Sequence, residues 1–159
     1  ARLLSCENGE LFCYWYRKKA LPRELLDDYF RDHSQHLSHA ELWELSEGLT
    51  ELGKVLHELN IEANFPSIPS LGVVGGRMDL QRFVYWNFVK CFWNHTLGHD
   101  NSVATNFDWY SPAKAKRFSE DDVDKDIGSA NLTKIFFSKE AACFSGRLRK
   151  NKKGLQVKI

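Results

Sequence analysis

The fold is decided by the stretch Glu10-Leu11-Phe12-Cys13-Tyr14-Trp15-Tyr16. It is rich in aromatic side chains, its only charge lies at its first position, and Gly9 and the basic run 17–19 bound it. An apolar run between a turn residue and charged residues is typical of a strand that is buried on both faces. Because such strands lie inside α/β sheets, the stretch predicts an α/β fold in which this strand has neighbours.

The composition bounds the class of protein. A chain of 159 residues with 43% apolar and 27% charged positions is typical of one soluble globular domain. The net charge of +1 favours neither nucleic acid nor a membrane surface as a partner. No apolar run is long enough to span a membrane and no stretch has the pattern of a secretion signal, so a cytoplasmic location is expected. The four cysteines are scattered, which predicts reduced thiols.

Two helices are predicted in the first half of the chain. Pro22, which suits a first helical turn, precedes apolar side chains at helical spacing and predicts a helix that ends near residue 33. Ser38 and Glu41 have the form of a capping box. The leucines that follow alternate steps of three and four up to Leu59, so one stripe of the second helix is expected to face a core.

The second half is predicted to hold two more helices and a strand hairpin. Asp79 can cap an aromatic helix over residues 80–93, which must be largely covered or cover something. A second capping pattern, which begins at Ser119, opens a short acidic helix that stops by residue 128. The other predicted segments are a connecting loop over residues 60–76, an irregular stretch over 95–112, and strands over 132–137 and 142–148.

Several motifs that could carry chemistry have a simpler structural interpretation. The glycine cluster 72–76 does not match GxGxxG and follows no predicted strand, so it predicts a connecting turn. His33, His36 and His39 are spaced by three, but a capping serine breaks the helix before the last of them, so no metal ligand is assigned. The basic residues at 147–153 are interpreted as a solvated strand end rather than a nucleic-acid site.

Residues 106–110 place an amide, a carboxylate and three aromatic side chains close together. Such a segment can fix the apolar body of a small molecule through a few polar contacts. Equally, Phe107, Trp109 and Tyr110 can simply anchor a long loop to the core. Long ordered loops in compact domains are often functional, and both interpretations stay open here.

The order of the segments resembles one bacterial branch of the class I S-adenosylmethionine-dependent methyltransferases, which carries a helical insertion after its fifth strand. The resemblance covers roughly residues 1–150, and the strand 10–16, after a helix end at Leu3-Leu4 and a turn at Gly9, is similar to the family's fifth strand. The closing pattern of the family, a capped helix and two strands, is similar to residues 119–149. The other stretches that carry the resemblance are Ala20-Leu21-Pro22-Arg23-Glu24-Leu25, Asp27-Asp28-Tyr29, Leu52-Gly53-Lys54, Met78-Asp79-Leu80-Gln81-Arg82-Phe83, Tyr85-Trp86 and Asn106-Phe107-Asp108-Trp109-Tyr110-Ser111-Pro112.

The resemblance implies the C-terminal portion of a Rossmann-like methyltransferase fold, with a small mixed sheet of about three strands and a largely helical insertion. In the family, the last strand runs antiparallel between the fifth and the sixth. The segments implied are a helix end and buried strand (1–19), the insertion with its lid and substrate loop (20–118), a capped helix with a strand hairpin (119–150), and a tail (151–159).

The family's cofactor-binding residues all precede its fifth strand. No residue that binds S-adenosylmethionine is therefore assigned to this chain, which is expected to begin within a larger fold and to be inactive alone. The partner that the resemblance implies is a small-molecule methyl acceptor. Because ligands of open α/β sheets bind beyond the carboxyl ends of the strands, the strand end is expected to lie near the pocket rim, the insertion to supply a lid, and residues 108–110 to line the acceptor cavity.

The acceptor-binding residues expected on this basis are Tyr16, Arg17, Lys18, Arg82, Tyr85, Trp86, Asp108, Trp109 and Tyr110. No catalytic base is assigned among the candidates His95, His99, Asp108 and Tyr110, since none of them has an assigned partner. A different class of function fits the same residues. The leucine stripe 42–59 and the aromatic helix can bind a partner helix, which would make the chain a non-catalytic interaction module or a pseudoenzyme remnant.

Overall fold

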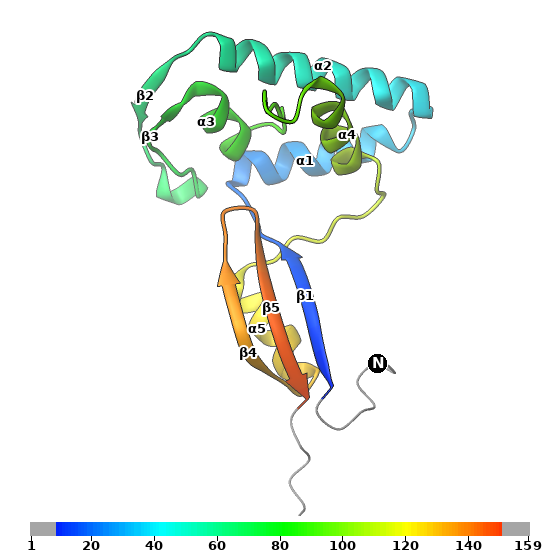
Figure 1. Cartoon of the computed structure of the whole chain (residues 1–159), viewed down its shortest axis with the longest axis vertical. Coiled ribbons are helices and arrows are strands. Elements are labelled where there is room, and N and C mark those ends of the chain that lie inside the picture. Colours follow the sequence, from blue (N-terminus) through cyan, green and yellow to red (C-terminus); the bar gives the residue numbers. More distant parts are fainter. Residues whose placement is uncertain (1–8, 151–159) are drawn as a thin grey trace, which may run out of the picture. The chain divides into compact units, whose positions relative to one another are not determined.

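The computed structural model describes residues 9–150, and these hold five α-helices and five β-strands (Figure 1). A fold that mixes helices with small sheets is therefore confirmed. The helix end expected at residues 1–4 and the tail 151–159 lie outside the described residues. The chain divides into two compact units, which we call the sheet unit (the described residues up to Lys18 and from Lys116 on) and the helical unit (Lys19–Ala115).

The sheet unit is a three-stranded sheet with one helix. It consists of β1 (Glu10–Tyr16), α5 (Glu120–Ser129), β4 (Leu132–Lys139) and β5 (Cys143–Lys150). The strand order is β1-β5-β4, so the last strand lies antiparallel between the other two, as expected. The prediction of a mixed sheet is wrong in one respect, because both hydrogen-bonded pairs are antiparallel.

Strand β1 is not buried on both faces, which corrects the prediction made from its sequence. Exposure alternates along the strand, and Phe12 is 74% exposed. Leu11, Cys13 and Trp15 pack instead against the core of the unit, to which α5 contributes Val123 and Ile127. The alternation is hidden in the sequence because the outward positions of the strand are aromatic rather than polar.

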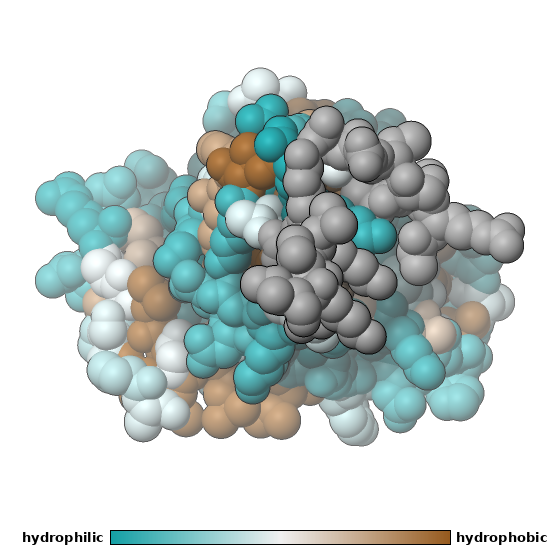
Figure 2. Space-filling view, turned by 90° about the horizontal axis from the view of Figure 1, so that it is seen from below, coloured by the Kyte–Doolittle hydropathy of each residue, from teal (hydrophilic) through white to brown (hydrophobic). Residues whose placement is uncertain are grey.

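The outward positions of β1 belong to an aromatic face of the sheet. Phe12, Tyr14 and Phe136 line a shallow hollow of about 350 Å³ with Arg147. Within residues 9–150, no strand pairs with the second edge of β1. The space-filling view shows hydrophobic residues that reach the surface between hydrophilic ones (Figure 2). β1 therefore offers both an open edge and an uncovered aromatic face.

An open edge next to exposed aromatic rings is expected to cause self-association. Sedimentation velocity should show oligomers that grow with concentration, and the double substitution Phe12→Lys with Tyr14→Lys should suppress them, because charged side chains block edge pairing. Tyr29→Lys, which changes an equally exposed ring of the helical unit, is the control and should have no such effect. A monodisperse monomer at all concentrations would contradict this prediction.

The helical unit begins with two long helices, both close to their predicted bounds. α1 spans Leu21–Ser34, with Pro22 in its first turn, and α2 spans His39–Glu58. The capping box at Ser38 is present. Leu42 and Leu49 of α2 pack against Trp109 and Tyr110. The stripe is only partly covered, since Leu52 and Leu59 at its far end are exposed.

The rest of the helical unit differs from the prediction. The loop expected at residues 60–76 contains β2 (Glu62–Phe65), a 3₁₀ turn (Pro69–Leu71) and the start of β3 (Gly76–Asp79), which pairs with β2 in a hairpin. The helix expected over residues 80–93 is shorter: α3 spans Leu80–Asn87. The stretch expected to be irregular holds α4 (His99–Tyr110).

Candidate functional site

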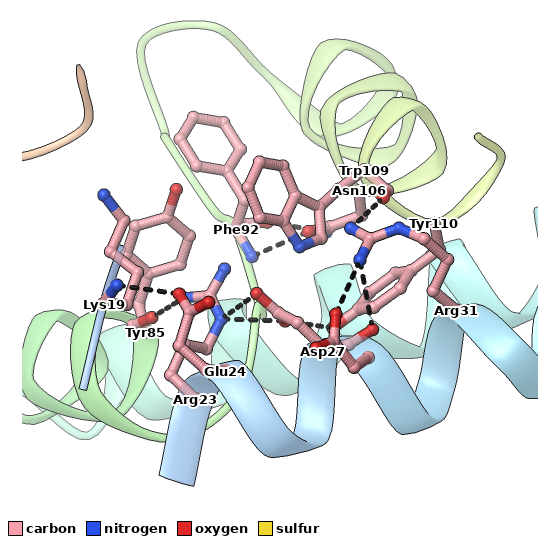
Figure 3. A network of polar contacts seen from close by, with 11 residues as sticks. Lys19, Arg23, Glu24, Asp27, Arg31, Tyr85, Phe92, Asn106, Trp109 and Tyr110 are labelled. Carbon is pink, nitrogen blue, oxygen red and sulfur yellow. Dashed lines mark hydrogen bonds and ion pairs between the residues drawn. The ribbon is translucent and has the colours of Figure 1, made fainter. Parts of the chain in front are cut away.

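A buried network of charged side chains lies at the centre of the helical unit and begins on α1. Arg23 is 1% exposed and Asp27 is fully buried. The Nε atom of Arg23 is 2.9 Å from both carboxylate oxygens of Asp27, and a further guanidinium N–H donates to the backbone carbonyl of Tyr85. Figure 3 shows these side chains rising from α1 toward α3 and α4. The pair links three helices.

Residues of α4 complete the network. The hydroxyl of Tyr110 donates to Asp27 at 3.1 Å, and burial raises the pKa of Tyr110 far above its ordinary value. Arg31 donates to the carbonyl of Trp109 at 3.0 Å, and the hydroxyl of Ser34 donates to the carbonyl of Tyr110 at 2.7 Å. Because each buried charge or carbonyl has a defined partner, the network fixes α1 against α4.

The segment between α3 and α4 is held in place from two sides. The amide of Asn106 accepts from the N–H of Phe92 at 3.0 Å and donates to its carbonyl at 3.1 Å. On the other side, Gly53 of α2 lets the backbone of Cys91 approach closely: a Cβ atom at Gly53 would lie 2.3 Å from the Cys91 carbonyl oxygen. The backbone of Cys91 and Phe92 is therefore held in place although it is not helical.

Lys90 lies in this segment and is 6% exposed. Its Nζ atom faces aromatic rings, at 4.6 Å from the ring centroid of Trp109, 5.9 Å from Tyr85 and 6.0 Å from Phe92. Burial lowers the pKa of Lys90 to about 7, and the nearby Arg23 guanidinium acts in the same direction. A lysine in this setting holds a substantial fraction of neutral amine near pH 7.

A pocket of about 340 Å³ lies beside this network. Its walls include four aromatic side chains, from Tyr85, Trp86, Phe92 and Trp93. Polar groups at the pocket come from Asp79, Gln81, Arg82, Asn94, Thr96 and two imidazoles, His57 and His95, whose rings stack at 5.9 Å. The buried indole nitrogen of Trp93 has no hydrogen-bond partner within residues 9–150. Such a mixture can hold a flat apolar molecule and orient it through a few polar groups.

The structure brings together only part of the acceptor-binding set predicted for the helical unit. Arg82, Tyr85 and Trp86 line the pocket together. Trp109 and Tyr110 are buried in the core, and Asp108 is exposed. The interpretation of residues 106–110 as an anchor to the core therefore fits these two aromatic side chains better than a pocket wall does.

The three residues predicted at the end of β1 have partners of their own within the sheet unit. Tyr16 is partly exposed and its ring meets that of Tyr14 edge-on at 5.3 Å. Arg17 donates to the carbonyl of Glu140 at 3.4 Å. Lys18 forms an ion pair of 2.8 Å with Asp122, and this hydrogen bond lowers the pKa of the Asp122 carboxyl, which also caps α5.

Each of the four candidate bases also has a defined environment. His99 lies 3.2 Å from a carboxylate oxygen of Glu51, and His95 stacks on His57. Asp108 is exposed, and Tyr110 is a hydrogen-bond donor to Asp27. Lys90, which sequence reasoning missed, is a buried amine whose pKa is lowered to about 7, mainly by burial. The only sequence signal was its position within a run of aromatic residues, 83–93.

No known protein family, curated protein or solved structure matches the chain. None of the helices in residues 9–150 combines the length and the apolar character needed to cross a membrane. In the same residues, no three His, Cys, Asp or Glu side chains are grouped so as to hold a metal ion.

The glycine cluster 72–76 lies in the connection between β2 and β3 and ends at the first residue of β3. Gly72 adopts a left-handed conformation (φ 65°) after the 3₁₀ turn, and a Cβ atom at Gly75 would lie 2.2 Å from the Phe65 carbonyl oxygen. These glycines form part of the connection within the β2–β3 hairpin, in the segment for which a connecting turn was predicted.

Proposed function

We propose that this chain is the acceptor-binding, C-terminal part of a cytoplasmic S-adenosylmethionine-dependent methyltransferase that acts on a small molecule. The observation that carries the proposal is the strand order β1-β5-β4, with β5 antiparallel between the other two. The helical unit is inserted directly after β1, and the capped helix α5 precedes the last two strands. This is the order of elements that the resemblance implies.

The exposed parts of β1 support the same proposal. In a doubly wound α/β sheet, an inner strand is paired on both edges and covered on both faces. β1 has one partner among the described residues, and its Phe12, Tyr14 and Tyr16 are exposed. A further strand and a covering helix from the cofactor-binding half would satisfy the edge and bury these rings.

The pocket of the helical unit supports an acceptor-binding role. Methyl transfer is an in-line displacement, so an enzyme accelerates it mainly by holding donor and acceptor in line in a site without water. Aromatic walls from Tyr85, Trp86 and Phe92 exclude water, while the exposed guanidinium of Arg82 and the indole N–H of Trp93 can orient a polar substituent. These groups are suited to a small aromatic or heteroaromatic acceptor.

The proposal predicts that this chain alone does not bind S-adenosylmethionine. Calorimetric titration of the chain should give no measurable heat of binding, because in the family that the chain resembles the cofactor-binding residues all precede the fifth strand. A polypeptide extended by the coding region upstream of Ala1 should bind the cofactor with micromolar affinity. Micromolar binding by the chain alone would contradict the prediction.

The upstream coding region provides a second, independent check. A strand followed by a glycine-rich turn encoded there would support the methyltransferase. A start codon directly before Ala1, or an extended product that fails to bind the cofactor, would overturn the proposal. For the interaction-module alternative, α4 already covers Leu42 and Leu49 of the leucine stripe, and only its far end, with Leu52 and Leu59, is exposed to a partner helix.

A further inference from the structure

Lys90 combines three properties that distinguish a reactive amine from a surface lysine. It is more than nine-tenths buried, its Nζ atom faces three aromatic rings, and within residues 9–150 no hydrogen bond or ion pair is found at that atom. The nearest buried carboxylate, Asp27, is already engaged by Arg23 and Tyr110. The amine therefore has no counter-ion of its own.

These surroundings favour the neutral amine, which is the nucleophilic form. Lysines become nucleophiles when they are desolvated among apolar groups or placed next to another cation, and Lys90 meets both conditions through the aromatic rings and Arg23. The other charges that act on it are Lys19, which disfavours its ammonium form, and Asp27 and Asp108, which favour it. The ring faces act in the opposite direction to burial, since they attract the ammonium form.

We propose that Lys90 forms a Schiff base with a small aldehyde or ketone. In this reaction the nitrogen lone pair attacks the carbonyl carbon, and the carbinolamine then loses its oxygen as water to leave a carbon–nitrogen double bond. No oxidant or second substrate is needed. The carbonyl compound is expected to have an apolar body, because the rings of Trp109, Tyr85 and Phe92 lie within 6.0 Å of Nζ.

The backbone geometry supports a positioned amine. Asn106 binds both backbone groups of Phe92, and Gly53 admits the carbonyl of Cys91, so the backbone on the C-terminal side of Lys90 is fixed. These contacts restrict the point from which the Lys90 side chain extends. The inference is independent of the proposed methyltransferase, because it concerns the amine of this chain and needs no cofactor.

The test is reductive trapping on the whole chain. Propionaldehyde and cyanoborohydride at pH 7 convert a Schiff base into a stable propyl group, which peptide mass mapping locates. Because an ordinary lysine is almost entirely protonated at this pH, Lys90 should be labelled about tenfold faster than the other lysines. Its rate should level off above pH 7, while the rates at other lysines keep rising to much higher pH.

Lys54 supplies a matched control. It also lies over a tryptophan ring, at 5.8 Å from Trp93, but it is partly exposed and 4.0 Å from a carboxylate oxygen of Glu51. Lys90→Met should remove the fast label and Lys54→Met should keep it. Equal labelling of all lysines, or slower labelling of Lys90 than of Lys54, would overturn the proposal, and wild-type mapping decides this even if the Lys90 variant does not fold.

Discussion

Asp27→Asn is expected to lower the free energy of unfolding of the helical unit by about 3–5 kcal/mol, because it leaves the Arg23 guanidinium buried without an opposite charge. The substitution preserves the shape of the side chain and so creates no cavity. Arg23 is 1% exposed and cannot turn to solvent without leaving the carbonyl of Tyr85. Denaturant titration followed by helical circular dichroism measures the change.

Asp28→Asn is the matched control on the same helix. The Asp28 side chain is 69% exposed and lies 3.5 Å from Arg31, so its loss should change stability by less than about 1 kcal/mol. A double variant with apolar residues at Arg23 and Asp27 should recover much of the lost stability, since replacing both partners removes the unpaired charge. Equal effects of the Asp27 and Asp28 substitutions would show that the buried pair is not the centre of the network.

Gly53→Ala is expected to destabilise the helical unit by about 1–3 kcal/mol, although alanine is the better helix former. The added Cβ would lie 2.3 Å from the Cys91 carbonyl oxygen and 3.0 Å from its carbon, so α2 and the segment after α3 must move apart. The same shift should displace Lys90 from the ring of Trp109. Thermal unfolding gives the stability, and propionaldehyde labelling reports the position of the amine.

Gly48→Ala on the same helix should raise the stability of the helical unit instead of lowering it. No atom lies within 4 Å of a Cβ placed there, so only the helix propensity changes, and stability should rise by about 0.5–1 kcal/mol. If both glycine variants were stabilised, the close approach of the Cys91 backbone would not exist in solution.

Local signals in the sequence predicted the elements whose ends are set by their own residues. The capping boxes at Ser38 and Ser119 both form, and both flank helices near their predicted bounds. α4 was missed because its N-cap residue, Gly98, has no side chain to cap the helix and because its buried face includes Ser102 and Asn106. A buried polar residue is invisible to a search for apolar periodicity.

The candidate site was predictable only in part, for a related physical reason. Arg82, Tyr85 and Trp86 lie within five positions of one another on a single short helix, so their common location follows from local spacing. Lys90 packs over the ring of Trp109, which is distant in sequence. It lacks a counter-ion because Asp27 is already paired with Arg23. These contacts form only in the folded chain, so the local sequence pattern does not predict them.

The chain leaves and re-enters the sheet unit at one point. Arg17 and Phe118 form a parallel bridge, the N–H of Phe118 donates to the carbonyl of Tyr16 at 2.8 Å, and the N–H of Lys18 donates to the carbonyl of Phe118 at 2.9 Å. Residues 19–115 are therefore inserted between two chain segments that are hydrogen-bonded to each other. Changes in the length or sequence of residues 19–115 can therefore be accommodated while the strand register of the sheet unit stays as it is.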